Sequence, residues 1–245
     1  MTQSHTGSGD VAPAAPTATG AGAAASGGTV LTIGIDVGGT NLRAGVVDPS
    51  GTVIDAVTVP TPREPAALDD ALVDVIGMLS GRHKVAAVGL AVAGFISREQ
   101  DLVRFAPHLP WRDSRVPERL SGRIGLPVFL EHDANSAAWG EVFFGPASAG
   151  HNVAVVAIGT GIGAALLVEG RMYRGSNGVA PELGHLPLVP DGRPCECGKR
   201  GCFERYCSGT ALATTASEML AAEPDRYTAR GARAGPLTGA AVAEA

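Results

Sequence analysis

The sequence has 245 residues, 45% hydrophobic and 18% charged, a composition typical of a folded globular protein rather than a disordered or fibrous one. Its formal net charge of −5 argues against sequence-independent nucleic-acid binding, because neutralising phosphates requires a surplus of Lys and Arg. No apolar run approaches the roughly 20 residues that a membrane-spanning helix needs, so no membrane segment is predicted.

Residues 1–28 are predicted to form a disordered, low-complexity tail. They are rich in Ala, Gly, Thr, Ser and Pro, and they lack the apolar side chains that would offset the entropy of ordering them. They also show neither the basic start nor the apolar stretch of a secretory signal. A cytoplasmic location is therefore expected.

An α/β pattern begins at Thr29. Short apolar or alternating runs predict strands, and apolar residues at helical spacing predict helices. The predicted strands are 30–35, 42–47, 52–59, 85–91, 127–130, 152–158 and 164–168, and the predicted helices are 64–79, 116–123 and 134–144.

A strand–glycine turn–strand unit occurs twice, with its turns at 36–40 and 159–163, about 120 residues apart. Glycine backbone can approach a polyphosphate closely, and the carboxylate of Asp36 could hold Mg²⁺ or its waters. The repetition predicts a duplicated α/β fold with a nucleotide between its halves; two unrelated tight hairpins are the alternative. The candidate nucleotide-binding residues are Asp36, Gly38, Gly39, Thr40, Gly159, Thr160, Gly161 and Gly163.

Asp133 follows a predicted strand and opens a predicted helix. It could be a helix N-cap, a role that Asp fills readily. It could instead accept the proton of a substrate hydroxyl during phosphoryl transfer, since ligands bind at the carboxyl ends of strands in α/β sheets.

All four cysteines lie between Cys195 and Cys207, which in a reducing compartment indicates a metal site rather than disulfides. One His and three Cys, namely His185, Cys195, Cys197 and Cys202, fall within 18 residues and could close a tetrahedral Zn²⁺ site. Cys207 competes for the fourth position, but it falls in a predicted helix and is predicted to be a small buried residue.

Together and in this order, the turn at 36–40, Asp133, the turn at 159–163, Glu-Leu-Gly-His at 182–185 and the cysteine loop at 195–204 resemble the ROK family (repressors, open reading frames, kinases). The similarity is greatest to its actinobacterial glucokinases, which the stretches at 105–111 and 137–141 also resemble. It extends from residue 29 to about residue 219.

The resemblance implies a duplicated actin/hexokinase-like (RNase H-like) fold, with a small lobe at 29–133 and a larger lobe at 134–245 that carries the zinc loop. It implies ATP-dependent phosphorylation of a hexose, most of all glucose, at its 6-hydroxyl, with MgATP held by the glycine turns and Asp133 as general base. It also assigns sugar contacts and a structural Zn²⁺. The implied sugar-binding residues are His132, Asp133, Glu182, His185 and Glu204, and the implied zinc ligands are His185, Cys195, Cys197 and Cys202.

The sequence departs from the family in two places. His132 stands where the family usually has Asn, and imidazole offers its donor and acceptor at different angles from those of an amide. After Met219 the chain becomes rich in Ala, Gly and Arg and ends at Ala245, whereas family members continue. The second lobe is therefore expected to be incomplete, without a glycine-rich turn beside the adenosine and a final helix that packs on the first lobe.

Other functions stay open. Another hexose could be the substrate, and the chain could be an inactive sugar-binding remnant. A sugar-sensing regulator would need an N-terminal helix-turn-helix, for which residues 1–28 are too short and lack helical periodicity. Self-association into a homo-oligomer is compatible with the sequence.

Overall fold

The computed structural model describes residues 30–146, 151–179, 181–223 and 238–243. Its largest sheet is mixed and has the strand order β3-β2-β1-β4-β8. Strands β1, β2 and β3 form an antiparallel meander, while β4 and β8 continue the sheet parallel to β1. The strands span Leu31–Val37 (β1), Asn41–Val47 (β2), Val53–Pro60 (β3), Val85–Val92 (β4) and Val128–His132 (β8).

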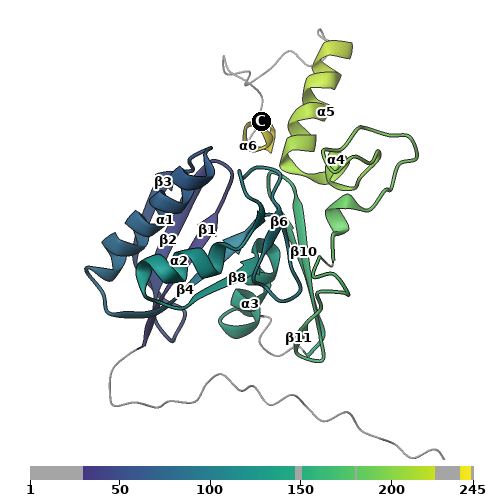
Figure 1. Ribbon diagram of the computed structural model, residues 1–245. Coiled ribbons are helices and arrows are strands. Elements are labelled where there is room, and N and C mark those ends of the chain that lie inside the picture. The colour runs from purple at the N-terminus through teal and green to yellow at the C-terminus, as the bar shows by residue number, and fades with distance from the viewer. Residues whose placement is uncertain (1–29, 147–150, 180, 224–237, 244–245) are drawn as a thin grey trace, which may run out of the picture.

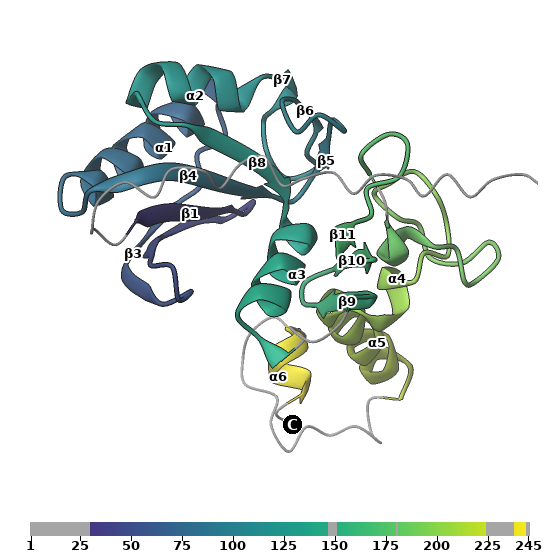
Figure 2. The same ribbon diagram turned by 90° about the horizontal axis from the view of Figure 1, so that it is seen from below.

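Two helices, α1 (Pro65–Ser80) and α2 (Val116–Ile124), cover one face of this sheet (Figures 1 and 2). Pro65 suits the first turn of α1 because a helix leaves its first N–H groups unpaired. The buried side chains of α1 recur at helical spacing and meet alternate residues of the strands, which forms the main core. These helix residues are Leu68, Leu72, Val75, Ile76 and Leu79.

An ion pair between the buried Asp69 and the exposed Arg119 joins the two helices. Asp69 of α1 accepts hydrogen bonds from Trp111 Nε1 (3.2 Å) and from Arg119 Nε of α2 (2.9 Å). The paired carboxylate sits at the edge of an otherwise apolar core, where an unpaired charge would be costly.

Helix α3 (Asp133–Phe143) follows β8 and lies between the main sheet and a second sheet (Figure 2). The second sheet is antiparallel, with the order β11-β10-β9. A small core of Ala138, Ala165, Leu167 and Met172 joins it to α3. Its strands span Val153–Ile158 (β9), Ile162–Val168 (β10) and Arg171–Met172 (β11), and a third small sheet contains β5 (Phe95–Ile96), β6 (Val103–Phe105) and β7 (Arg112–Ser114).

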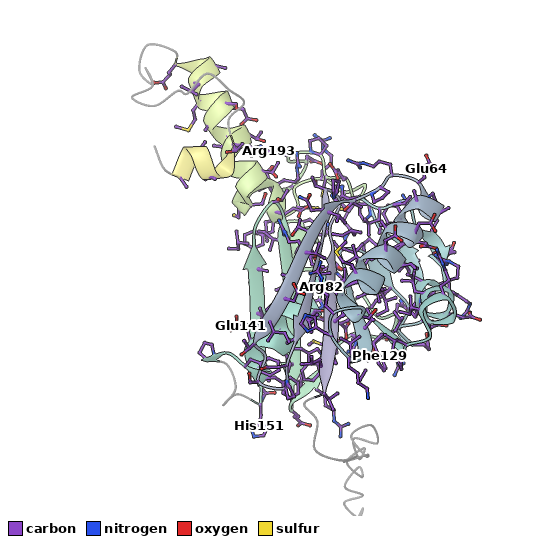
Figure 3. All side chains as sticks on the ribbon, turned by 90° about the vertical axis from the view of Figure 1, so that its left-hand side faces the viewer. Glu64, Arg82, Phe129, Glu141, His151 and Arg193 are labelled. Atoms are coloured by element: carbon purple, nitrogen blue, oxygen red, sulfur yellow. The ribbon has the colours of Figure 1, made fainter. Side chains whose placement is uncertain are left out.

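The chain beyond β11 contains little regular structure before its last helices. A 3-10 turn, η2 (Leu183–His185), precedes the cysteine loop, and α4 (Glu204–Cys207), α5 (Gly209–Ala222) and α6 (Gly239–Ala243) follow it. Arg193 connects this loop to α5, because its guanidinium donates a hydrogen bond to Thr215 Oγ1 at 3.1 Å. In Figure 3, Arg193 lies near the lower end of α5.

Every strand and helix predicted from the sequence is present, with ends within two residues of the prediction. The sequence did not predict the short strands β5, β6, β7 and β11, which are two or three residues long and too short to show a period. The predicted tail at 1–28 lies outside the described residues. Among the described residues, no helix is long and apolar enough to span a membrane.

Candidate active site

The first glycine turn connects β1 to β2. Its hairpin is closed by a bond from Gly38 N to Asn41 O (3.1 Å). Thr61, which is buried, braces the turn from the end of β3, donating its hydroxyl to Gly38 O (2.6 Å). A Cβ on Gly39 would lie 2.6 Å from His108 Cβ, so only glycine fits there.

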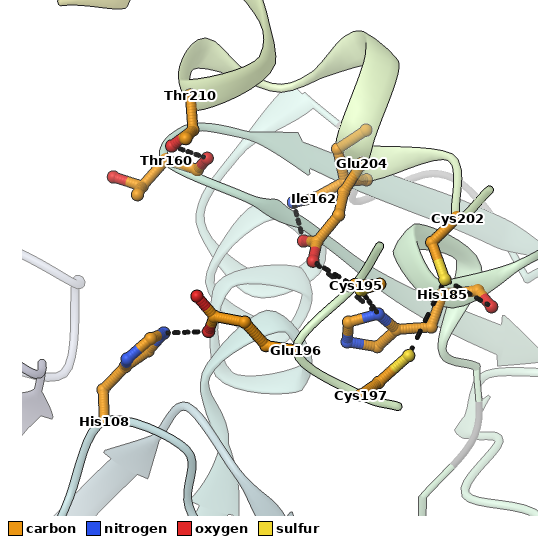
Figure 4. Close-up of polar contacts among 10 residues, drawn as sticks. All are labelled: His108, Thr160, Ile162, His185, Cys195, Glu196, Cys197, Cys202, Glu204 and Thr210. Atoms are coloured by element: carbon orange, nitrogen blue, oxygen red, sulfur yellow. Dashed lines mark hydrogen bonds and ion pairs between the residues drawn. The ribbon is translucent and has the colours of Figure 1, made fainter. Parts of the chain in front are cut away.

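The second glycine turn connects β9 to β10 and is held by the segment that follows the cysteine loop. Gly209 N donates to Gly159 O (2.8 Å), and Thr210 Oγ1 donates to Thr160 O (2.8 Å; Figure 4). A Cβ on Gly161 would lie 2.7 Å from Glu204 Oε2. The turn is therefore shaped by residues more than 40 positions further along the chain.

The second glycine turn ends earlier in the structure than the predicted range of 159–163, because β10 already begins at Ile162. Gly163 lies within β10, where it pairs with Ala157, and a Cβ on it would lie 3.2 Å from the Cβ of Ala134 at the start of α3. Its position is explained by close packing between β10 and α3.

Asp133 is the first residue of α3, at the carboxyl end of β8. The N-cap prediction is wrong, because His132 occupies the N-cap position and no side chain caps the helix. Asp133 Oδ1 instead accepts a bond from the adjacent Ala134 N (2.7 Å). Its side chain is 42% exposed, which leaves the carboxylate accessible to a ligand.

Tertiary folding brings the predicted sugar-binding residues together. His132 Nδ1 lies 3.3 Å from Asp133 Oδ1, and His132 Nε2 lies 3.8 Å from Glu182 Oε1. His185 Nδ1 lies 3.7 Å from Glu204 Oε1. Glu204 also accepts a bond from Ile162 N (3.3 Å) and so connects this group to the second glycine turn.

Four carboxylates of the site influence one another. Burial, together with the negative charges of Asp133 and Glu204, raises the pKa of Glu182 to about 7. Burial also raises the pKa of Asp36, an effect that Arg43 partly offsets and Asp133 reinforces. A site with this excess of negative charge suits a cation or a neutral polyol with many hydroxyl donors.

The four predicted metal ligands also converge. The donor atoms of His185, Cys195, Cys197 and Cys202 all lie within 4.8 Å of one another. Cys195 Sγ is 3.5 Å from His185 Nδ1, and Cys197 Sγ is 3.6 Å from Cys202 Sγ (Figure 4). One imidazole and three thiols form the donor set that Zn²⁺ takes in closed tetrahedral sites.

Cys207 lies outside this group and is exposed. The prediction that it is buried is therefore wrong. Helix α4 spans only Glu204–Cys207, and none of its residues is buried, so its last residue faces solvent.

Sequence reasoning missed a polar network centred on Glu131. Its carboxylate accepts bonds from His132 N and Asn135 Nδ2 (both 3.0 Å) and from Gln100 Nε2 (2.8 Å), and it pairs with Arg174. The sequence offered one signal for this network, namely that Glu131 lies at the end of a predicted strand, two residues before Asp133. The partners come from distant segments and could not be identified from spacing.

Comparison with known proteins identifies the family. The family model described as "ROK family" matches residues 32–238. The chain belongs to the ROK family. It is 43% identical over 196 residues to the glucokinase of Streptomyces coelicolor, covering 80% of this chain and 62% of that protein. It is 34% identical over 186 residues to the xylose repressor of Bacillus subtilis, covering 74% of this chain and 48% of that protein.

Solved structures of ROK proteins have the same fold. A ROK family glucokinase from Streptomyces griseus, in complex with glucose and AMPPNP, superposes with a TM-score of 0.78 at 38% identity, covering 87% of this chain and 70% of that one. ROK hexokinase from Thermus thermophilus gives a TM-score of 0.68 at 34% identity, covering 78% of this chain and 65% of that one. The actin/hexokinase-like fold predicted from the sequence is thereby confirmed. This ROK chain spans 62% of the length of the Streptomyces coelicolor relative.

Proposed function

We propose that this ROK chain transfers the γ-phosphoryl group of MgATP to the 6-hydroxyl of a hexose, with glucose as the first candidate. The observation that carries the proposal is the position of Asp133. Its accessible carboxylate follows the carboxyl end of β8 and lies close enough to Glu182 to raise the pKa of that residue. The charge of Asp133 also acts on Asp36 beside the first glycine turn. The glucokinase names of relatives in two Streptomyces species are consistent with this chemistry.

In the proposed reaction, Asp133 orients the sugar hydroxyl and accepts its proton as the oxygen attacks the γ-phosphorus. A bond forms between O6 and phosphorus, the bond from phosphorus to the bridging oxygen breaks, and ADP leaves. The carboxylates of Glu182 and Glu204 and the imidazoles of His132 and His185 bind the other hydroxyls. Backbone N–H groups of the two glycine turns would receive the phosphates, and the Asp36 carboxylate would hold Mg²⁺ or its waters.

We further propose that His185, Cys195, Cys197 and Cys202 hold a structural Zn²⁺, which the donor set fits. The metal would supply a rigid closed centre in a loop with few apolar residues. Glu204 gains most from that rigidity, because it follows Cys202 by two residues and lies 3.7 Å from His185 Nδ1. The loop then orients Glu204 toward the sugar and toward the second glycine turn.

The test is ADP release by the full chain with MgATP and a panel of hexoses. Asp133→Asn should lower glucose-dependent turnover by about 10²- to 10⁴-fold, the usual contribution of a general base. Asp74→Asn, an exposed change on α1, is the matched control and should leave turnover unchanged. Folded, zinc-loaded chain that binds glucose without turnover would refute the kinase proposal. That outcome would favour a sugar-binding role related to that of the xylose repressors.

A further inference from the structure

The first residues of helix α5 hold the second glycine turn by its carbonyl groups. Gly209 N donates to Gly159 O (2.8 Å), and Thr210 Oγ1 donates to Thr160 O (2.8 Å; Figure 4). A trans peptide group is planar, with its C=O and N–H pointing in opposite directions. Fixing the carbonyls of Gly159 and Thr160 therefore also orients the N–H groups of Thr160 and Gly161. Among the described residues, neither of these N–H groups donates a hydrogen bond within the protein.

Helix α5 has few apolar contacts that could fix its direction. Of its 14 residues, Gly209–Ala222, only Ala211 is buried. Figures 1 and 3 show the helix projecting away from the two sheets. Helix α6 packs beside its start, where a Cβ on Gly239 would lie 2.5 Å from Gly209 O. The direction of α5 therefore depends on α6 and on polar contacts further along the helix.

The guanidinium of Arg193 supplies such contacts midway along α5. Its Nη1 donates to Arg205 O (2.9 Å), and Nη1 and Nη2 both donate to Thr215 Oγ1 (3.2 and 3.1 Å). The guanidinium also lies over the ring of Tyr206, 5.1 Å from its centroid. The Arg193 side chain is 21% exposed, so these contacts are largely shielded from water. Its ion pair with Glu218 contributes less, because the Glu218 side chain is 59% exposed.

The backbone of Arg193 belongs to the cysteine loop. Its N–H donates to the Tyr206 hydroxyl (2.7 Å), and its carbonyl accepts a bond from Gly201 N (2.9 Å), next to Cys202. A Cβ on Gly192 would lie 2.1 Å from the same hydroxyl, so the loop backbone approaches the ring closely. Arg193 therefore joins the loop that carries the proposed metal ligands to the helix that holds the second glycine turn.

We propose that Arg193 is a positioning residue for the nucleotide. Through Thr215 it sets the direction of α5, and α5 orients the peptide groups of the second glycine turn toward the phosphates of ATP. The inference rests on the proposed kinase function. Arg193 gives no atom to a substrate, so its effect is on the binding of ATP rather than on that of the sugar. A contact that only stabilised the fold would change the fraction of folded protein and neither KM.

The first experiment compares the unchanged full chain with Thr215→Val, which removes the acceptor on α5 and keeps the shape of the side chain. The KM for ATP should rise about three- to tenfold, part of the roughly 100-fold that a displacement of about 1 Å can cost. The KM for glucose should stay unchanged. Thr214→Val is the matched control, because Thr214 Oγ1 donates within the helix, to Thr210 O (2.9 Å). Equal KM values for ATP in Thr215→Val and the unchanged chain would overturn the proposal.

A double-mutant cycle tests whether Thr215 acts through Arg193. Arg193→Lys keeps the positive charge but loses the planar fork that reaches Arg205 O and Thr215 together. If the two side chains form one connection, the double variant should raise the KM for ATP no more than the stronger single variant does, at equal zinc content. Increases that multiply would show that the two side chains act independently, and the proposal would fail.

A third readout does not depend on turnover. Amide hydrogen exchange at Gly209 reports on its bond to Gly159 O, and it should be about three- to tenfold faster in Thr215→Val but not in Thr214→Val. Unaltered exchange at Gly209 in Thr215→Val would also overturn the proposal. If the unchanged chain shows no turnover, the kinase function fails, but these exchange rates still decide whether Arg193 positions the turn through α5.

Discussion

Replacing Glu131 by Ala should destabilise the chain strongly. The Glu131 side chain is 15% exposed and that of its partner Arg174 is 23% exposed, so most of this ion pair is shielded from water. The substitution would leave the guanidinium without its counter-charge, although Arg174 Nε is already buried without a partner. It would also remove the acceptor of Gln100 Nε2 and Asn135 Nδ2.

Breaking a buried pair by removing one partner costs about 3–5 kcal/mol. The remaining exposure of Arg174 places the expected loss near the lower end, about 3 kcal/mol. Glu131→Gln keeps the shape and an acceptor oxygen but removes the charge, and should cost about half as much, since a hydrogen bond to a charged group exceeds a neutral one by about 1 kcal/mol or more. A double-mutant cycle that combines Arg174→Ala with Glu131→Ala should give an interaction free energy of about 1–3 kcal/mol between the two side chains.

The assay is urea unfolding followed by far-ultraviolet circular dichroism at constant pH and zinc concentration. Glu141→Ala is the matched control, because Glu141 is an exposed residue of α3, at the left-hand side of the molecule in Figure 3. If Glu131→Ala lowers the free energy of unfolding by no more than Glu141→Ala does, the network does not hold β8, α3 and the segment after β11 together. The reasoning would then be refuted.

Three further predictions concern the metal loop, the buried carboxylate and the first glycine turn. Cys202→Ser should abolish stoichiometric zinc binding and lower the midpoint of thermal unfolding. Cys207→Ser, at an exposed position, should leave zinc binding and the midpoint unchanged. Equal zinc content in the two variants would contradict the proposed ligands. Because folding raises the Glu182 pKa from 4.5 to about 7, its carboxyl should destabilise the fold as pH rises through this interval. Over this interval the free energy of unfolding of the unchanged chain should fall by about 2–3 kcal/mol relative to that of Glu182→Gln. Urea midpoints that show the same pH dependence in both proteins would contradict this prediction. Thr61→Val should remove the brace on Gly38, cost about 1 kcal/mol and weaken nucleotide binding measured by calorimetry, unlike Thr58→Val on the exposed side of β3.

The sequence alone predicted the elements that position the site. Hydrophobic period distinguishes strands such as β4 from helices such as α1, because each element must bury one continuous face. The four candidate metal ligands, whose donor atoms the structure brings together, were also predicted from the sequence, since a loop of 18 residues from His185 to Cys202 could close on one ion by local folding.

Local patterns misjudged two positions whose surroundings are set by neighbouring elements. Cys207 was predicted to be buried because cysteine usually is, but α4 is a single turn without a buried face. Asp133 was considered as an N-cap, but the helix begins with Asp133 itself, so the carboxylate lies inside the first turn.

Only the tertiary structure decided which side chains meet. His132 contacts Glu182, and Glu131 pairs with Arg174, across separations of more than 40 residues. Such contacts depend on how α3 packs against β10 and on where the segment after β11 returns to β8, which a periodic pattern does not encode. The chemical groups of this site could therefore be read from the sequence, whereas their mutual distances, and with them the charge on Glu182 and the partners of His132, follow from the packing of the two sheets about α3.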